Sequence, residues 1–164
     1  MPIGASTRPF ADSNFVFLWL KNSSIQTHKP MNTSDLTINQ LCDIVRETSY
    51  AIHRYHRNGH LEKIYENALA HRLRKQGITV EQQYPLDVYD EDGTLLGKFA
   101  ADLLIDNRLI LELKAVKRIA EEHVSQILGY LCSSRIETGL LINFGAPRLY
   151  VKKYLMSDID SEEI

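Results

Sequence analysis

The chain has 164 residues, of which 44% are hydrophobic and 24% charged, and its formal net charge is −2. This composition is close to the average for globular proteins, which excludes a wholly disordered chain and a membrane protein, and the length suits one domain of common size. The negative charge argues against a broadly basic nucleic-acid-binding surface, so phosphate binding would have to be local or assisted by a metal ion.

Residues 1–30 mix Pro, Ser, Asn and Thr with one apolar cluster and show no sustained helical or strand period. We therefore expect a poorly ordered extension at 1–30, one domain at 31–157 and an acidic tail at 158–164. Met31 stands at the start of the regular pattern, which raises the hypothesis that translation begins there. Without residues 1–30, which carry three Lys/Arg and one Asp, the remaining chain has a net charge of −4.

The apolar cluster at 15–20 is too short for a transmembrane helix, which needs about 20 apolar residues. It also lacks the basic flank and the cleavage pattern of a signal peptide. Cys42 and Cys132 have no CxxC partner and no His at zinc-ligand spacing, so we expect buried free thiols. These features favour a cytoplasmic protein that does not enter a membrane.

Two helices are predicted to precede any strand. The first covers about 36–57, with Ser34 or Thr37 as its N-cap, and should stop near the Asn-Gly pair at 58–59. The second covers about 61–76 and ends where a Lys-Gln-Gly sequence supplies a cation and a glycine that can adopt a left-handed conformation. The apolar positions at helical spacing are Leu36, Leu41, Ile44, Val45, Ala51, Ile52 and Tyr55, then Leu61, Ile64, Tyr65, Ala68, Leu69 and Leu73.

Five strands and a third helix follow. Pro85 lies within the first strand pattern and indicates an edge strand or a break. The expected order α-α-β-β-β-α-β-β defines an α/β fold with a three-stranded meander and a mixed sheet flanked by helices. The predicted ranges are strand 78–89, turn 90–93, strands 95–105 and 109–116 joined by 106–108, helix 119–133, and strands 139–143 and 148–154.

Glu112 and Lys114 interrupt an otherwise apolar strand, LILELKAV at 109–116. Because side chains alternate along a strand, these two share one face with Ile110 and Val116. An exposed Glu/Lys pair on an edge strand is one interpretation. The apolar neighbours on the same face favour the other, in which the charges are buried and therefore paired or bound to a metal.

Asp102 interrupts the neighbouring apolar strand. If the connection 106–108 counts as three residues, Ile105 faces Leu109 and Asp102 lies directly across from Glu112, about 5 Å away. An even connection would place Asp102 opposite Leu113 unless a bulge intervened. Two carboxylates at that distance repel, and oxygen ligands with a nearby Lys suit Mg²⁺ or Mn²⁺.

A further carboxylate comes from the second predicted helix, where Glu62 and Glu66 are four residues apart. Glu62 projects onto the edge of the apolar sector, and Glu66 is expected slightly further out. Either acid could contribute to the cation site. The alternatives are a first-turn carboxylate favoured by the helix dipole for Glu62 and a solvated residue for Glu66.

Four short motifs resemble those of one family, the GxxExxY proteins: GHLEKIY at 59–65, ADLL at 101–104, ELK at 112–114 and LLINFGAPR at 140–148. Each is weak alone, but their order and spacing over about 33–155 are specific. That family is similar to the PD-(D/E)xK nuclease superfamily, in particular its RecB-type branch. The resemblance implies a restriction-endonuclease-like fold; Ala101 stands where the superfamily's nominal Pro would be.

The resemblance also implies site residues and an activity. The superfamily Asp falls on Asp102 and its QxxxY motif on Gln126 and Tyr130. The ExK motif falls on Glu112 and Lys114, and the helix acid is Glu62 or Glu66. The implied metal ligands are Asp102, Glu112 and the helix acid, with Lys114 acting on the nucleophile.

The expected activity is therefore Mg²⁺- or Mn²⁺-dependent hydrolysis of nucleic acid, with DNA as the expected substrate. The strongest alternative is a module that keeps the nuclease fold and binds nucleic acid or protein without cutting, which the acidic charge and small size favour. A metal-dependent enzyme acting on another phosphate is a weaker option. A homodimer or a protein partner is also expected, because a single domain often needs one to select its substrate.

Overall fold

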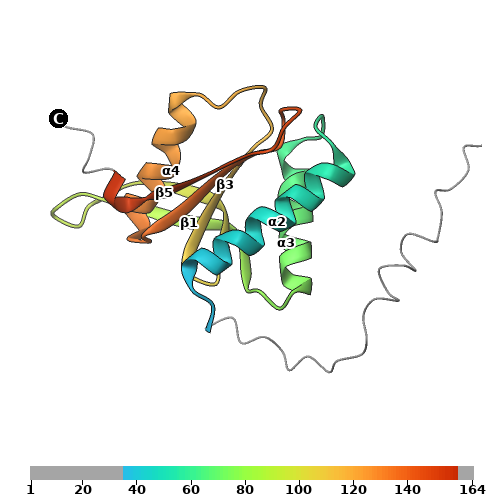
Figure 1. The fold of residues 1–164 in the computed structure, drawn as a ribbon. Helices are drawn as coiled ribbons and strands as arrows, with labels where there is room; N and C mark the ends of the chain where they lie inside the picture. The colour runs from blue at the N-terminus through green and yellow to red at the C-terminus, as the bar shows by residue number, and fades with distance from the viewer. Residues whose placement is uncertain (1–34, 159–164) are drawn as a thin grey trace, which may run out of the picture. The chain divides into compact units, whose positions relative to one another are not determined.

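The computed structural model describes residues 35–158, and every structural statement below refers to this part of the chain. The expected N-terminal extension, its apolar cluster, Met31, Ser34 and all of the C-terminal tail except Asp158 lie outside the described residues. Figure 1 shows the elements, whose order α-α-β-β-β-α-β-β is the predicted one. In chain order they are α2 (Ile38–His56), α3 (Glu62–Lys75), β1 (Val80–Tyr89), β2 (Leu95–Ile105), β3 (Leu109–Lys114), α4 (Glu121–Ser134), β4 (Thr138–Asn143), β5 (Tyr150–Leu155) and the 3₁₀ helix η2 (Met156–Asp158).

The strands form one five-stranded mixed sheet in the order β1-β2-β3-β4-β5. β3 and β4 are parallel and are connected through α4, whereas the other neighbours are antiparallel. β1 to β3 form the predicted meander. β1 lies at a sheet edge and pairs with β2 only. Pro85, opposite Ala100, has no N–H to donate, and an edge strand tolerates this because it has no second neighbouring strand.

Helices cover both faces of the sheet, and β3 is buried between them. Leu109, Leu111 and Leu113 belong to the core cluster under α2 and α3, while Ile110 belongs to a second cluster that includes Ile127 of α4. The alternation of side chains along the strand thus divides β3 between two cores. Any polar side chain on this strand is enclosed by protein.

The helix ends follow from local chemistry. Thr37 caps α2: its hydroxyl accepts from the Gln40 backbone N–H at 3.2 Å, and Gln40 Oε1 accepts from the Thr37 N–H at 2.8 Å. After α3, Gly77 takes the expected left-handed conformation with φ +82°. Within residues 35–158 no helix has the length and hydropathy needed to cross a bilayer.

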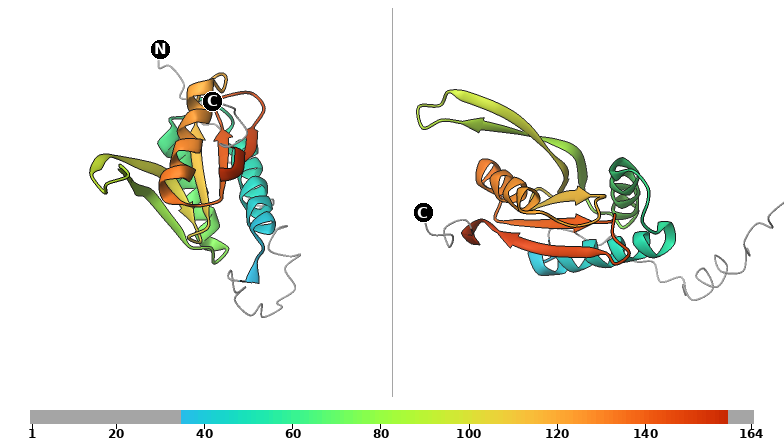
Figure 2. Two further views of the ribbon diagram at one scale, coloured as in Figure 1. Left: turned by 90° about the vertical axis from the view of Figure 1, so that its left-hand side faces the viewer. Right: turned by 90° about the horizontal axis from the view of Figure 1, so that it is seen from above.

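The β1–β2 hairpin extends past the other strands, and its outer part lies over α4 (Figure 2). A groove of about 690 Å³ lies between them. Val88 and Phe99 line it from the hairpin, and Gln126 and Tyr130 are among the residues that line it from α4. The groove therefore reaches two of the predicted site residues.

Several sequence expectations require correction. Cys132 was expected to be buried, but it is exposed on α4 beside the groove, whereas Cys42 is buried and both are free thiols. Tyr55, Leu61 and Ile64, which fit the helical apolar pattern, are 77%, 78% and 45% exposed and belong to neither core cluster. β3 ends at Lys114, before the predicted 116, and α4 begins two residues later than predicted.

Candidate active site

Asp102 and Glu112 lie on two neighbouring strands, β2 and β3. Asp106 and Asn107 have positive φ angles of 51° and 55°, and Ile105 O accepts from the Arg108 N–H at 3.0 Å. Asp and Asn tolerate this conformation better than most residues. Ile105 consequently pairs with Leu109, as the three-residue connection predicts, and this register would place Asp102 opposite Glu112 if the pairing continued.

The two strands separate where the acids stand. Backbone pairing of β2 with β3 covers three residue pairs and ends at Leu103 and Leu111. Beyond it, the Leu113 N–H donates to Asp102 Oδ2 at 2.7 Å. The Asp102 carboxylate thus accepts from the backbone amide of β3, and this contact fixes it beside Glu112.

Glu112 and Lys114 form a buried pair. Glu112 is 2% exposed and the Lys114 side chain 12%, which excludes the interpretation as an exposed edge pair. Lys114 Nζ donates to Glu112 Oε1 at 2.5 Å. Glu112 Oε2 is buried and accepts no hydrogen bond from the described residues. A buried carboxylate oxygen without a donor is costly, so this atom has capacity for a further ligand.

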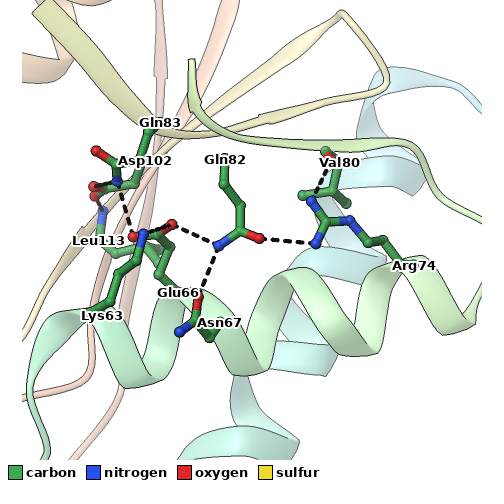
Figure 3. A network of polar contacts seen from close by, with 9 residues as sticks. All are labelled: Lys63, Glu66, Asn67, Arg74, Val80, Gln82, Gln83, Asp102 and Leu113. Atoms are coloured by element: carbon green, nitrogen blue, oxygen red, sulfur yellow. Dashed lines mark hydrogen bonds and ion pairs between the residues drawn. The ribbon is translucent and has the colours of Figure 1, made fainter. Parts of the chain in front are cut away.

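Glu66 is buried, which corrects the expectation that it lies further out than Glu62. Its oxygens accept from Lys63 Nζ at 2.7 Å, from Gln82 Nε2 at 2.8 Å and from Gln83 Nε2 at 3.0 Å, as Figure 3 shows. The helical projection failed because β1 crosses α3 at this point and covers Glu66 with its two glutamine side chains.

Glu62 is half-buried one turn earlier on α3. Burial raises the pKa of its carboxyl group, and the nearby Ala115 backbone amide, immediately after Lys114, opposes this effect. The charge of Glu62 interacts with those of Lys114 and Asp102. Both helix acids therefore approach the strand acids, Glu62 from the end of β3 and Glu66 from the side of β1.

Gln126 and Tyr130 lie on the face of α4 that turns towards the site. Gln126 Nε2 donates to the Tyr130 hydroxyl at 2.6 Å, as their spacing of four residues allows. Tyr130 is buried, and burial, together with the charge of Glu112, raises the pKa of its hydroxyl. The structure thus brings both residues to the charges on β3.

Burial raises the pKa of three carboxyl groups in this cluster. It raises the pKa of Glu112 to about 7, with a further contribution from the charge of Asp102. Burial also raises the pKa values of Asp102 and Glu62, and Glu66 adds to both effects. Burial alone would lower the pKa of Lys114, but its hydrogen bond to Glu112 and the surrounding carboxylates outweigh burial and raise it. Perturbed groups that concentrate at one place are typical of a functional site.

Asn143 holds the chain just beyond Lys114. Its side chain bonds both the N–H and the C=O of Val116, at 3.0 and 2.8 Å, and accepts from the Gly145 N–H at 3.0 Å. The sequence analysis missed Asn143 as well as Gln82 and Gln83. Asn143 could have been noticed as a polar residue at the end of an apolar strand. The two glutamines could have been noticed as adjacent amide side chains shortly before Pro85.

The donor set fits a hard divalent cation. Among residues 35–158, no three Asp, Glu, His or Cys side chains converge closely enough to form a ready-made metal site. Mg²⁺ does not require such a group, because it usually takes one or two carboxylates and retains several waters. Glu112 Oε2 supplies an unengaged oxygen. Burial above all raises the pKa values of Glu112 and Asp102, with a smaller contribution from neighbouring carboxylates, and a bound cation would favour the charged form of both acids.

The mixed sheet with Asp102, Glu112 and Lys114 at its separating strands defines a restriction-endonuclease-like α/β protein. Residues 39–154 match the PD-(D/E)XK nuclease superfamily, and the chain belongs to this superfamily. The fold and superfamily predicted from the sequence are therefore confirmed.

Two further comparisons were made. Among solved structures, the chain is similar to one described as "Crystal structure of SSO0001", with 19% sequence identity and a TM-score of 0.49. The similarity covers 57% of this chain and 48% of that one, so the chain spans about half the length of that protein. A comparison with curated proteins gave no significant match.

Proposed function

We propose that the protein is a Mg²⁺- or Mn²⁺-dependent nuclease that hydrolyses phosphodiester bonds of nucleic acid, with DNA as its substrate. The observation that carries this proposal is the buried Glu112, whose Oε2 accepts no hydrogen bond from the described residues, beside Asp102 and Lys114 in a PD-(D/E)XK protein. A carboxylate in that position favours a bound cation over a purely structural role.

In the proposed site Asp102 and Glu112 hold the cation, and Glu62 or Glu66 completes its shell or positions water. When bound, the cation supplies Lewis-acid activation of water and of a phosphodiester oxygen.

Lys114 has the electrostatic role in the proposed reaction. Its ammonium group lies 2.5 Å from Glu112 and is kept protonated by the surrounding carboxylates, which raise its pKa. A fixed positive charge here orients the attacking oxygen or stabilises the charge that builds on the phosphate. Gln126 and Tyr130, which bond each other, fix the side of the site formed by α4.

Calorimetric titration with Mg²⁺, followed by cleavage assays on single- and double-stranded DNA and RNA, tests the proposal. Glu112→Ala should abolish Mg²⁺ binding and cleavage. Lys114→Ala should retain Mg²⁺ binding and lose cleavage by about 10²–10³-fold, as for removal of one charge-stabilising group. Exposed Glu47 on α2 and exposed Lys152 on β5 provide matched Glu→Ala and Lys→Ala controls that should leave both properties unchanged.

The catalytically silent module is the second candidate function. The observation that favours it is the absence, within residues 35–158, of three side chains already converged on a metal position, together with the acidic chain. Mg²⁺ binding without cleavage of any substrate would support the module, and failure to bind Mg²⁺ would remove the basis of the nuclease proposal.

We also propose the finer assignments that the sequence indicates. These are membership of the GxxExxY group within the RecB-type branch, a cytoplasmic location, a domain at 31–157, and a homodimer or a protein partner. The motif GHLEKIY at 59–65 supports the first. Light scattering after size-exclusion chromatography tests the dimer.

A further inference from the structure

Gln83 has an unusual backbone conformation for a residue within a strand. Its φ angle is +53°, in the left-handed region that non-glycine residues rarely adopt, and Gln is not among the residues enriched there. Its neighbours pair normally, Gln82 with Leu103 and Tyr84 with Ala101. A left-handed residue inside a regular ladder is strained and persists only where the surrounding structure holds it.

The Gln83 side chain connects two acids that come from different elements. Its Nε2 donates to Glu66 Oε2 of α3 at 3.0 Å and, through a longer bond of 3.4 Å, to Asp102 Oδ1 of β2 (Figure 3). The amide nitrogen has two hydrogens, so one group serves both carboxylates. It is neutral, and it lies between two groups whose charges repel.

We propose that Gln83 is a positioning residue that fixes the orientation of Asp102 for the cation, with Glu66 as the anchor that holds Gln83 in place. Asp102 then has each oxygen held, Oδ2 by the Leu113 N–H and Oδ1 by Gln83. The part that concerns the cation rests on the proposed function.

This assignment also separates the two helix acids. Lys63, Gln82 and Gln83 occupy the oxygens of Glu66, which suits an anchor. Glu62 lies beside Lys114 and Asp102 instead and is the helix acid that reaches the cation. The sequence pattern left these two alternatives open, and the three donors on Glu66 favour Glu62.

Gln83→Gly tests the inference, because it removes the side chain and suits the positive φ. Glycine relieves the strain at this φ, but it removes a donor to Glu66 and gives the unfolded chain more freedom, so a purely structural role predicts a changed melting temperature and no change at Asp102. A positioning role predicts that Asp102 also becomes free, in EDTA, to rotate away from the Leu113 amide.

Hydrogen exchange of the Leu113 amide in EDTA is the readout that needs no metal. We expect about tenfold faster exchange in Gln83→Gly, because the acceptor of this amide is no longer held. We also expect Mg²⁺ affinity to fall about 10–100-fold, the usual effect of removing a group that orients a ligand. Gln82→Ala is the matched control: its side chain bonds Glu66, Asn67 and Arg74 but not Asp102, and Lys63 still donates to the same Glu66 oxygen, so both readouts should stay at wild-type values.

Unchanged Leu113 exchange in Gln83→Gly, or the same acceleration in Gln82→Ala, would overturn the positioning role. Wild-type-like Mg²⁺ affinity in Gln83→Gly would overturn it as well, while leaving the proposed nuclease intact. If the wild type binds no Mg²⁺, the proposed function fails and the cation part of the inference fails with it. The exchange measurement still decides whether Gln83 orients Asp102.

Discussion

Glu112 and Lys114 form an ion pair inside an apolar sheet, where apolar residues in place of the whole pair would often be no less stable. Lys114 engages one oxygen of Glu112, and the other accepts no hydrogen bond from the described residues. Ion pairs buried in this way contribute little net stability, because desolvation offsets the attraction. A site that keeps such a residue is better explained by binding than by stability.

The pH dependence of stability should report Glu112 directly in metal-free protein. Its pKa is about 7 in the folded chain and near the ordinary 4.5 when unfolded. Between these values the folded state binds more protons, so the free energy of unfolding falls as pH rises through this window, by up to about 3 kcal/mol. Urea unfolding in EDTA from pH 4.5 to 8 measures this slope.

Glu112→Gln should flatten that slope. The remaining decline comes from Asp102 and Glu62, whose pKa values burial raises in the same direction. The slope is the quantity to compare, since the amide also alters the bond to Lys114 and so shifts stability at every pH. Equal slopes in the variant and the wild type would show that Glu112 titrates normally.

The residues of the site differ in how far the sequence could predict them. Asp102, Glu112 and Lys114 were predictable because strand alternation and the length of one short loop fix which side chains meet. Glu66 was placed wrongly because burial by β1 is a tertiary effect that a helical projection does not contain. Gln83 could not be predicted at all, since nothing in a Gln-Gln-Tyr-Pro sequence signals a positive φ.

At the scale of elements, the loop after β4 packs directly against the end of β3. A Cβ on Gly145 would lie 2.3 Å from both Ala115 C and Val116 N, which are backbone atoms and cannot move aside cheaply. We expect Gly145→Ala to destabilise the protein by about 1–3 kcal/mol or more, as overpacking does. Chemical denaturation measures the change.

Gly129 is the matched control, because it lies in α4 and a Cβ there would have no atom within 4 Å. Gly129→Ala should stabilise the protein by about 0.5–1 kcal/mol through helix propensity. Because the loop holds the residues that follow Lys114, Gly145→Ala should also reduce cleavage more than its stability loss explains. Similar stability of the two variants would mean that the loop adjusts around the added methyl group.

The elements themselves were largely predictable, since each has a clear period and an end signal. Thr37, one of two N-cap candidates, and the glycine at 77 indicated helix ends, and the turn at 106–108 gave the pairing of β2 with β3. Strand and helix boundaries near 116–120 were not predictable, because Asn143 rather than local sequence determines how the chain leaves β3.

For the whole molecule, a net charge of −2 and a site lined by acids predict that nucleic acid binds weakly unless a divalent cation is present. Tight non-specific binders make 6–10 phosphate contacts and lose about 10³–10⁵ in affinity between 50 and 200 mM salt. This chain should lose about tenfold or less, because few Lys or Arg side chains replace counterions. Fluorescence anisotropy with labelled DNA at several NaCl concentrations measures the slope.

The same titration should separate a cation held by the site from cations that merely screen the DNA. Ca²⁺ takes oxygen ligands as Mg²⁺ does, and its addition should strengthen binding to the wild type by bridging the acids and a phosphate. Glu112→Ala should gain much less, although screening by Ca²⁺ is identical for both proteins. If Ca²⁺ strengthens DNA binding equally in the wild type and in Glu112→Ala, the acids take no part in holding the substrate. If affinity falls steeply with NaCl concentration, a basic surface outside the site carries the binding instead.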